Sequence, residues 1–199
     1  MKTFLHVGCG QNRKEQTTRG FNTPEWHELR LDIDANVNPD IVGTMTDMSA
    51  LADASVDALF SSHNIEHLYP HDVPLALKEF LRVLKPDGFV VITCPDLQPV
   101  CALVAEDKLV DTAYVSAAGP ITPLDILYGH RVSMALGNHY MAHRCGFTKK
   151  VMLATLQAAG FGAVAIISRP QYFDLYALAS KSYRSETEVR LLAGEHFPA

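Results

Sequence analysis

The sequence has no long hydrophobic run, no cluster of basic residues and no signal-peptide core. Its 199 residues include 17 Lys or Arg against 22 Asp or Glu, which gives a formal net charge of −5. Because this balance does not attract phosphate backbones or anionic lipid, we expect neither nucleic acid nor a membrane as a partner. No apolar stretch approaches the ~20 residues that cross a bilayer, and residues 1–3 lead directly into an expected strand.

Paired cysteines are also lacking. The four cysteines form no CxxC motif; they are Cys9, Cys94, Cys101 and Cys145. Disulfide frameworks are typical of small secreted domains, so we expect reduced thiols and a cytoplasmic protein. With 199 residues, 48% of them hydrophobic, the chain is long enough for one well-buried domain and short for two.

The dinucleotide fingerprint GxGxxG is incomplete. Residues 4–10 read Phe-Leu-His-Val-Gly-Cys-Gly, but Arg13 stands at the third glycine position. A short apolar run that stops on Gly-x-Gly predicts a buried parallel strand and a tight turn, where backbone can approach a ligand. The missing third glycine argues against NAD. Residues 11–28 are polar, so we expect the usual first helix to be short or absent.

Acidic residues follow the glycine turn by about 20 positions. Leu29, Leu31 and Ile33 alternate in a second expected strand over residues 28–33, with Asp32 near its end. A carboxylate at this place can accept hydrogen bonds from both ribose hydroxyls, which favours Asp32 as a ribose ligand. Asp34 is the alternative, and either residue could simply form a turn or a cap.

A third short strand over residues 40–43 leads into a loop over residues 44–51. This loop carries Asp47 and Met48, whose polar atoms and thioether could hold an adenine. A simple helix cap by Asp47 is the competing interpretation.

A strand, helix and strand follow in order. Residues 58–61 form a fourth expected strand. A helix is predicted from the N-cap Asp72 to Pro86, because Leu77, Phe80, Leu81 and Leu84 recur at helical spacing. After a turn at residues 85–88, residues 89–93 form a continuous apolar fifth strand. Two apolar strands around a helix predict a right-handed crossover in a parallel sheet.

These motifs together resemble the class I S-adenosylmethionine-dependent methyltransferases, in particular the small-molecule branch with a type 11 methyltransferase domain. The resemblance spans about residues 4–96 and rests on His-Val-Gly-Cys-Gly, Leu-Asp-Ile-Asp, Phe-Ser-Ser-His-Asn-Ile-Glu-His-Leu and Leu-Arg-Val-Leu-Lys-Pro-Asp-Gly. It implies a single-domain, Rossmann-like α/β fold with a mostly parallel seven-stranded sheet and helices on both faces. It also implies S-adenosylmethionine as cofactor, held by Gly8, Cys9, Gly10, Asp32, Asp47, Met48, Ser62 and His63.

The rest of the chain matches no fixed motif. We expect a methyltransferase domain over residues 1–180, in which residues 97–147 form a substrate lid at the C-terminal edge of the sheet. A helix over residues 149–159, capped by Thr148 and ended by Gly160, precedes two last strands. Residues 181–199 are expected to be a polar tail. A small enzyme with an apolar lid could form a homodimer.

The predicted activity is in-line methyl transfer from S-adenosylmethionine to an oxygen, nitrogen or carbon atom of a small-molecule acceptor. Such a transfer needs positioning and exclusion of water, and a base where the acceptor must lose a proton. Histidine suits that role near neutral pH. The candidate catalytic residues are His63, His67 and His143; His130 and His139 of the expected lid could also reach the site, and each of the five could instead be structural.

Three alternatives remain from the sequence. His63, Glu66 and His67 satisfy the HxxEH pattern of zinc peptidases, but that pattern requires a long helix. Some methyltransferases that act on quinone-type phenols resemble this segment and use a divalent ion, which would give Glu66 and His67 a role in substrate binding. We instead expect no metal and expect both side chains to hydrogen-bond the loop into place. A non-catalytic S-adenosylmethionine-binding protein is the third alternative, since Thr44 replaces the acid usual in the family.

Overall fold

The computed structural model describes residues 1–198. Within them, one seven-stranded sheet has the spatial order β3-β2-β1-β4-β5-β9-β8. Its strands are β1 (Lys2–Val7), β2 (Trp26–Asp32), β3 (Ile41–Val42), β4 (Val56–Ser62), β5 (Leu84–Pro95), β8 (Ala163–Arg169) and β9 (Asp174–Ser180). The strands β1 to β5 pair in parallel, while β9 runs antiparallel to β5 and β8. The predicted Rossmann-like, mostly parallel sheet is therefore confirmed.

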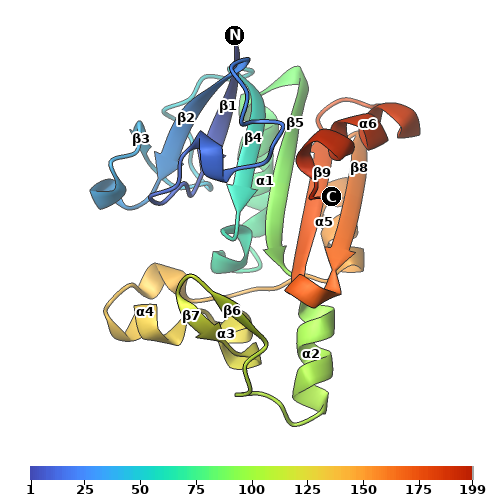
Figure 1. Ribbon diagram of the computed structural model, residues 1–199. Helices are drawn as coiled ribbons and strands as arrows, with labels where there is room; N and C mark the ends of the chain where they lie inside the picture. Colours follow the sequence, from blue (N-terminus) through green and yellow to red (C-terminus); the bar gives the residue numbers. More distant parts are fainter. Residues whose placement is uncertain (199) are drawn as a thin grey trace.

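Helices cover both faces of this sheet (Figure 1). The α-helices are α1 (Val73–Val83), α2 (Leu97–Ala105), α3 (Pro123–Tyr128), α4 (Arg131–Ala135), α5 (Lys149–Ala159) and α6 (Glu186–His196). Short 3₁₀ turns are η1 (Lys14–Gln16), η2 (Ala35–Val37), η3 (Ile65–His67), η4 (His139–Met141) and η5 (Pro170–Tyr172). In the part of the chain that the structure describes, no helix is long and apolar enough to cross a membrane.

Neighbouring residues of the central strands point to opposite faces and build two cores. Leu5 and Val90 pack on the face covered by α1 and α5, whereas Phe4 and Val91 pack on the face covered by α6. Both members of each pair are apolar because a central parallel strand is buried on both sides. This explains why the strands read as continuous apolar runs in the sequence.

Of the two helices on the first face, α5 begins and ends where its caps predict, whereas Asp72 makes no side-chain capping bond in α1, which ends at Val83 and not at the expected Pro86. The side chain of Thr148 accepts a hydrogen bond from Val151 N–H at the start of α5, and Gly160 ends it in the left-handed conformation. Helix α1 has a proline in its first turn and ends one residue before Leu84. Residues 85–88, expected as a turn, lie instead within the long strand β5.

The segment after the glycine turn contains η1 where the fold usually has its first helix. Phe21 from this segment lies flat on Phe4, with ring centroids 4.3 Å apart, and is fully buried. It also stacks on Phe89 at 5.9 Å. One aromatic side chain thus supplies the apolar cover that a helix would otherwise bring to this face.

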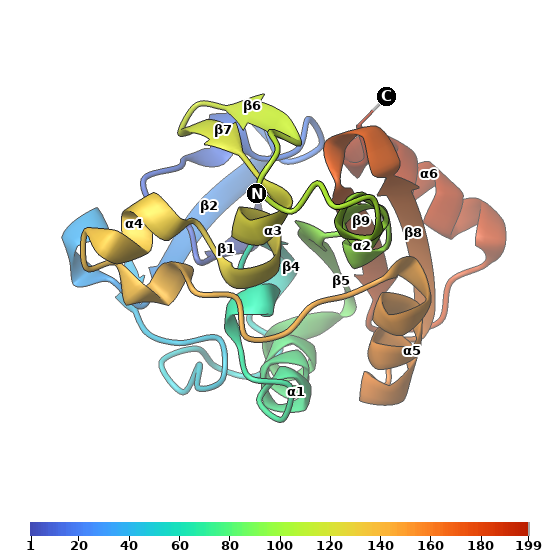
Figure 2. The same cartoon turned by 90° about the horizontal axis from the view of Figure 1, so that it is seen from below.

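The segment between β5 and α5 lies over the C-terminal ends of the parallel strands (Figures 1 and 2). It contains α2, a small antiparallel pair of strands, β6 (Tyr114–Ser116) and β7 (Gly119–Ile121), then α3, α4 and η4. The chain returns to the sheet where Leu97 N–H donates to Phe147 O at 2.9 Å. The residues expected to form a lid, 97–147, therefore lie at the edge where such folds bind ligands.

The expectation of a polar tail over residues 181–199 is wrong for most of that range. Helix α6 forms there, with Ser185 as N-cap and with Val189, Ala193 and His196 buried. Ala193 and Phe197 join the aromatic core around Phe21. The sequence of α6 is mostly polar, but its buried apolar residues lie on one side of the helix and pack on the sheet. They cover a face of the sheet on which the usual first helix is missing. Residue 199 lies outside the described residues.

Candidate functional site

The glycine turn follows β1 and has a left-handed backbone at both glycines, with φ +60° at Gly8 and +51° at Gly10. Gly10 N–H donates to Asp32 Oδ2 at 2.7 Å. A Cβ built on Gly10 would meet no atom within 4 Å among the described residues, so the surface over Gly10 is open. Cys9 between them points inward and is fully buried, and this burial raises the pKa of its thiol to about 11. Gly10, rather than Cys9, therefore offers bare main chain to a ligand.

Asp32 joins the end of β2 to this turn. Its Oδ1 accepts from Asp34 N–H at 2.9 Å while its Oδ2 accepts from Gly10 N–H, and the residue is buried. Each carboxylate oxygen keeps a further lone pair for an outside donor. Asp34 instead caps η2, where its side chain accepts from Asn36 N–H. The structure thus places Asp32, and not Asp34, against the glycine turn.

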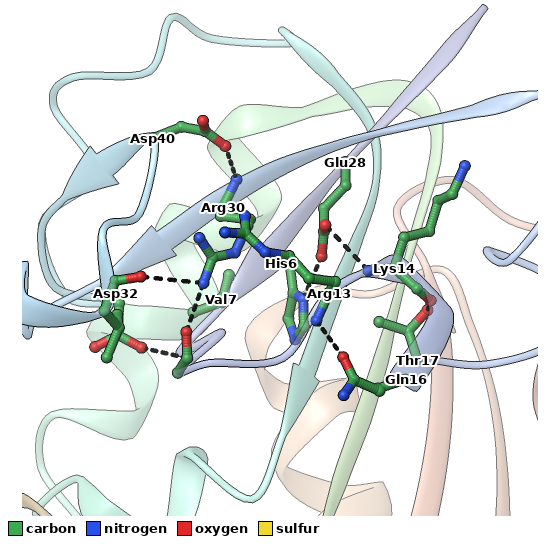
Figure 3. A network of polar contacts seen from close by, with 12 residues as sticks. His6, Val7, Arg13, Lys14, Gln16, Thr17, Glu28, Arg30, Asp32 and Asp40 are labelled. Atoms are coloured by element: carbon green, nitrogen blue, oxygen red, sulfur yellow. Dashed lines mark hydrogen bonds and ion pairs between the residues drawn. The ribbon is translucent and has the colours of Figure 1, made fainter.

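A buried arginine below the turn was missed in the sequence. Arg30 is 2% exposed and donates to Gly10 O at 2.5 Å and to Asn38 O at 2.8 Å. Its own N–H donates to Asp40 Oδ2 at 2.7 Å (Figure 3). Arg30 therefore ties the glycine turn to the loop after β2. The sequence pattern of β2 does not indicate that the side chain of Arg30 reaches the glycine turn.

A second polar network anchors the segment that replaces the first helix (Figure 3). His6 Nδ1 lies 2.7 Å from Glu28 Oε1, and Glu28 Oε2 accepts from Lys14 N–H at 3.0 Å. The ammonium of Lys14 reaches Thr23 O and Trp26 O. Burial lowers the pKa of His6 despite the neighbouring Glu28 carboxylate. These bonds hold η1 against the sheet without a helix.

Gly8 has a different role from Gly10. The amide of Asn64 donates to Val7 O at 3.0 Å and to Ser62 O at 2.9 Å, directly over Gly8. A Cβ on Gly8 would lie 2.1 Å from Asn64 Oδ1. Gly8 is thus needed for the close approach of the loop after β4, a packing reason that the glycine pattern alone did not reveal.

The two residues predicted to flank an adenine differ in exposure. Asp47 is exposed and its Oδ1 accepts from Ser49 N–H at 3.0 Å, which forms a local turn and not the helix cap of the competing interpretation. Met48 is 1% exposed and its side chain packs in the core below α1, so its contact with an adenine stays a prediction that the position of its thioether does not support. Ile33, directly after Asp32, is a large apolar side chain that is 49% exposed. It is the better candidate for an apolar ring face beside the ribose ligand.

The end of β4 carries the next predicted residues. Ser62 Oγ lies 2.7 Å from Thr93 Oγ1, which leaves it at the junction of β4 and β5. His63 follows with φ +53°, an uncommon conformation for a residue other than glycine, and its side chain is 51% exposed. Strained residues of this kind gather at ligand sites. The backbone of His63 is held by its N–H bond to Thr93 O at 2.9 Å.

Glu66, three residues further, is a buried carboxylate surrounded by three histidines. His63 Nδ1 lies 3.3 Å from Glu66 Oε1. Desolvation lowers the pKa of His63, but the adjoining Glu66 carboxylate outweighs this and raises it. Burial would raise the pKa of Glu66, but the charges that His63, His67 and His143 can carry lower it. The expectation that the Glu66 side chain hydrogen-bonds the loop is wrong: neither carboxylate oxygen has a hydrogen-bond partner within residues 1–198.

The lid brings His143 to this cluster from a distant part of the chain. The rings of His67 and His143 meet edge to face with centroids 4.9 Å apart. Arg144 N–H donates to Glu66 O at 2.8 Å, which fixes the end of the lid to η3. Burial lowers the pKa of His143. The three predicted catalytic histidines, His63, His67 and His143, are therefore neighbours in space.

A cavity of about 670 Å³ opens between these histidines and the lid. Its apolar walls come from β6, β7, α3 and the η5 turn, and the residues used below are Tyr114, Ile121, Ile126, Tyr172 and Phe173. Tyr114 and Phe173 are stacked with ring centroids 6.1 Å apart. Several charged and polar side chains, among them Glu66, Asp125 and Arg169, also line this hollow, and apolar walls combined with polar groups are typical of a small-molecule site.

Ion pairs hold the wall of this cavity in place. Arg131 Nε donates to Asp125 Oδ1 at 2.7 Å, and Thr122 and Asp125 cap α3 reciprocally. The Arg131 guanidinium holds the pKa of Asp125 well below its usual range. On the other wall, Arg169 pairs with Asp174. Of the remaining lid histidines, His130 lines the cavity, whereas His139 is exposed and lies outside its lining.

Comparison with known proteins agrees with this geometry. Residues 5–92 match the family model described as a methyltransferase domain. No curated protein matches the chain in sequence. A Burkholderia thailandensis 1,6-didemethyltoxoflavin-N1-methyltransferase, solved with 1,6-didemethyltoxoflavin and S-adenosylhomocysteine, superposes with a TM-score of 0.56 at 17% identity, over 91% of this chain and 71% of that one.

Two further solved structures share the fold. A methyltransferase from Thermotoga maritima, dependent on S-adenosylmethionine, superposes with a TM-score of 0.58 at 14% identity, over 92% of this chain and 83% of that one. Another from Methanosarcina mazei gives 0.57 at 15% identity, over 92% and 93%. At these identities the similarity shows the fold.

The sheet order and the glycine turn define a class I methyltransferase fold. Residues 5–92 match the family model of a methyltransferase domain, of the kind that uses S-adenosylmethionine. The predicted family, enzyme class and cofactor are thus confirmed. The zinc-peptidase alternative loses its support, because its motif spans a strand end, the left-handed His63 and the three-residue turn η3 rather than a long helix.

Proposed function

We propose that the protein transfers the methyl group of S-adenosylmethionine to a small aromatic acceptor held in the cavity under the lid. The observation that carries this proposal is the position of His63. It follows Ser62 at the end of β4, on the strand next to the glycine turn, and it lines the acceptor cavity. A nucleophile in the cavity therefore faces the region where the cofactor family binds its donor.

The residues around the glycine turn fit the cofactor. Gly10 leaves open main chain for the amino-acid part, Asp32 has free lone pairs for the ribose hydroxyls, and the exposed Ile33 offers an apolar face to the adenine. When bound, S-adenosylmethionine supplies a methyl group already activated by its sulfonium. The chain itself needs to position the acceptor, exclude water and take up a proton.

The acceptor class follows from the cavity walls. Tyr114, Phe173 and Tyr172 present flat surfaces, while Ile121 and Ile126 add apolar contacts. Aromatic side chains stack on aromatic ligands with an energy of about 0.5–1.5 kcal/mol beyond burial. The Burkholderia neighbour is a small-molecule methyltransferase, which supports the same class. A flat ring that carries a hydroxyl or N–H group meets both the walls and the histidine edge.

His63 is the residue positioned to take the acceptor's proton. Its Nδ1 faces Glu66 at 3.3 Å and its half-exposed ring faces the cavity. Bound S-adenosylmethionine would supply the methyl group, and His63 would take up the proton that the acceptor loses. The rings of His67 and His143 are each held by backbone carbonyls, His67 by those of Ala142 and His63 and His143 by that of Ile126, whereas the ring of His63 contacts none among the described residues.

The experiment is turnover of labelled S-adenosylmethionine with a panel of hydroxylated and N–H aromatic compounds. We expect methylated product with at least one panel member, and a loss of kcat of ~10²–10⁴-fold in His63→Ala with little change in affinity for S-adenosylhomocysteine. His71→Ala is the matched control, since His71 is 77% exposed and lies outside the cavity lining. Full kcat in His63→Ala would remove the assigned base, and no turnover with any panel member would contradict the acceptor class.

We also propose a cytoplasmic location. All four cysteines are free in the described part of the chain. Cys94 lies in the hydrophobic core and Cys145 packs against it, and the two form no disulfide. Reduced thiols are the normal state in a reducing compartment. Fractionation of the native host, followed by detection of the protein, would test this location.

A further inference from the structure

The floor of the acceptor cavity holds three groups with the spacing of metal ligands. One ligand atom each from Glu66, His67 and His143 lie within 4.8 Å of one another. Glu66 and His67 come from η3, and His143 comes from the end of the lid, 76 residues further along the chain. The ligands of a tetrahedral zinc ion stand roughly 3.3 Å apart, a difference that ordinary side-chain rotations cover.

The Glu66 carboxylate is the strongest sign that a cation belongs here. Glu66 is 1% exposed, and neither of its carboxylate oxygens finds a hydrogen-bond donor among residues 1–198. The nearest cationic group is His63, whose Nδ1 forms an ion pair with Glu66 Oε1 at 3.3 Å when the ring is protonated. That half-exposed imidazole faces Oε1 alone, so Oε2 keeps no partner among the described residues. A buried carboxylate without donors costs several kcal/mol unless a cation compensates for the lost water. A metal ion would supply that compensation.

The orientation of His143 fits a metal ligand. Its Nδ1 lies 2.8 Å from Ile126 O. Because a carbonyl oxygen only accepts, Nδ1 carries the hydrogen and Nε2 keeps its lone pair. An imidazole whose second N–H is bonded to a backbone carbonyl is the usual arrangement at protein metal sites.

His67 shows a conflict that a metal would resolve. Its Nδ1 and Nε2 each lie 3.1 Å from a backbone carbonyl, of Ala142 and of His63. A neutral imidazole has one N–H, so only one of these contacts can be a hydrogen bond. The other ring nitrogen has a lone pair that points at the lone pair of a carbonyl oxygen, which is unfavourable. A rotation of the ring would instead direct this lone pair toward a cation beside Glu66.

We propose that Glu66, His67 and His143 bind one divalent transition-metal ion. Two imidazoles and one carboxylate are a donor set that suits Zn²⁺, Co²⁺ or Fe²⁺ better than Mg²⁺ or Ca²⁺, which prefer oxygen ligands. Three protein ligands leave a position open toward the cavity. At that position an acceptor oxygen or nitrogen can bind and lose its proton more readily; this role rests on the proposed function, whereas the metal site does not.

The test is metal binding by the full chain, without a histidine tag and after treatment with chelator. Titration calorimetry and metal analysis with Zn²⁺ are expected to give about one ion per chain at micromolar affinity. Co²⁺ should give the visible absorption of a low-symmetry nitrogen and oxygen site. Glu66→Gln and His143→Ala should each weaken binding at least tenfold, in line with the loss of one ligand.

The matched control is His139→Ala. His139 is an exposed histidine of the same lid outside the cluster, so this variant should bind metal as the wild type does. Thermal unfolding shows whether each variant is folded. The proposal is overturned if the wild-type protein takes up no stoichiometric Zn²⁺ or Co²⁺, which would mean that charged histidines alone neutralise Glu66. It is also overturned if folded Glu66→Gln and His143→Ala bind metal as the wild type does.

Binding of S-adenosylhomocysteine separates this proposal from the proposed function. The cofactor product is titrated into the same metal-free and metal-loaded protein. Cofactor binding without metal uptake overturns the metal site alone. Metal uptake without cofactor binding overturns the methyl-transfer role alone.

Discussion

The amide of Gly10 donates a hydrogen bond to the carboxylate of Asp32 across 2.7 Å. This bond joins the turn after β1 to the end of β2, so the two groups assigned to the cofactor form one rigid unit. The buried side chain of Arg30 supports this unit by donating a hydrogen bond to Gly10 O. A change in either Asp32 or Gly10 should therefore be measured on both cofactor affinity and fold stability.

Gly10→Ala should weaken binding of S-adenosylhomocysteine at least tenfold, because the new methyl group occupies the open surface over the turn. The left-handed backbone also costs about 1–2 kcal/mol of stability for any residue with a Cβ. Gly137→Ala is the matched control: it has φ +95° and, within the described residues, open space around its Cβ. Calorimetry should show normal affinity for S-adenosylhomocysteine in the control. An equal loss of affinity in both variants would mean that backbone strain, and not the blocked surface over Gly10, weakens binding.

Asp32→Ala should weaken cofactor binding by about 1–3 kcal/mol, since paired hydrogen bonds to the ribose are lost. Asp34→Ala should leave the affinity nearly unchanged, because that side chain bonds Asn36 at the start of η2. Titration of both folded variants with S-adenosylhomocysteine measures the difference. A larger loss in Asp34→Ala would transfer the ribose role to that residue.

His196 should make the protein less stable in mild acid. Burial and the nearby charge of Arg19 lower its pKa to about 4 in the folded state, against 6.5 when exposed. The unfolded chain therefore takes up a proton that the folded chain refuses. This stabilisation is complete above pH 6.5, falls as the pH drops toward 4, and amounts to about 3 kcal/mol at most.

Urea unfolding of wild type and His196→Phe between pH 7 and pH 5 measures this dependence. Phenylalanine can keep the ring contacts with Phe21 and Phe89, at 4.4 and 5.0 Å, but loses the 2.7 Å bond to Thr18. The variant should be less sensitive to pH than the wild type, whatever its absolute stability. An identical slope in both proteins would show that other groups, such as the buried His6, cause the dependence.

The thiols should react in a fixed order. Cys101 is exposed, whereas Cys9 is buried and its pKa is raised to about 11. Because the thiolate is the nucleophile, iodoacetamide at pH 8 should label Cys101 fast and Cys9 at least a hundredfold more slowly. Mass spectrometry over time identifies the sites, and Cys101→Ser should lack the fast phase. Fast labelling of Cys9 in the native protein would contradict its burial.

Some elements followed from the sequence because short stretches encode them. The apolar strands, the helix α1 and the capped helix α5 are each specified by neighbours within one or two turns of chain. The Gly-x-Gly turn and Asp32 were also predictable, since a strand that ends on glycines has few other uses. The family motifs then fixed the order of the sheet.

The tertiary structure alone decided which distant groups meet. Met48 enters the core and Ile33 becomes exposed although both are apolar, because the course of the loops after β2 and β3 sets their orientation. α6 folds where a polar tail was expected, since a missing first helix leaves an aromatic face to cover. His143 reaches Glu66 only when the lid returns to the sheet. Periodicity and capping act over a few residues, whereas these contacts depend on packing between segments far apart in the chain.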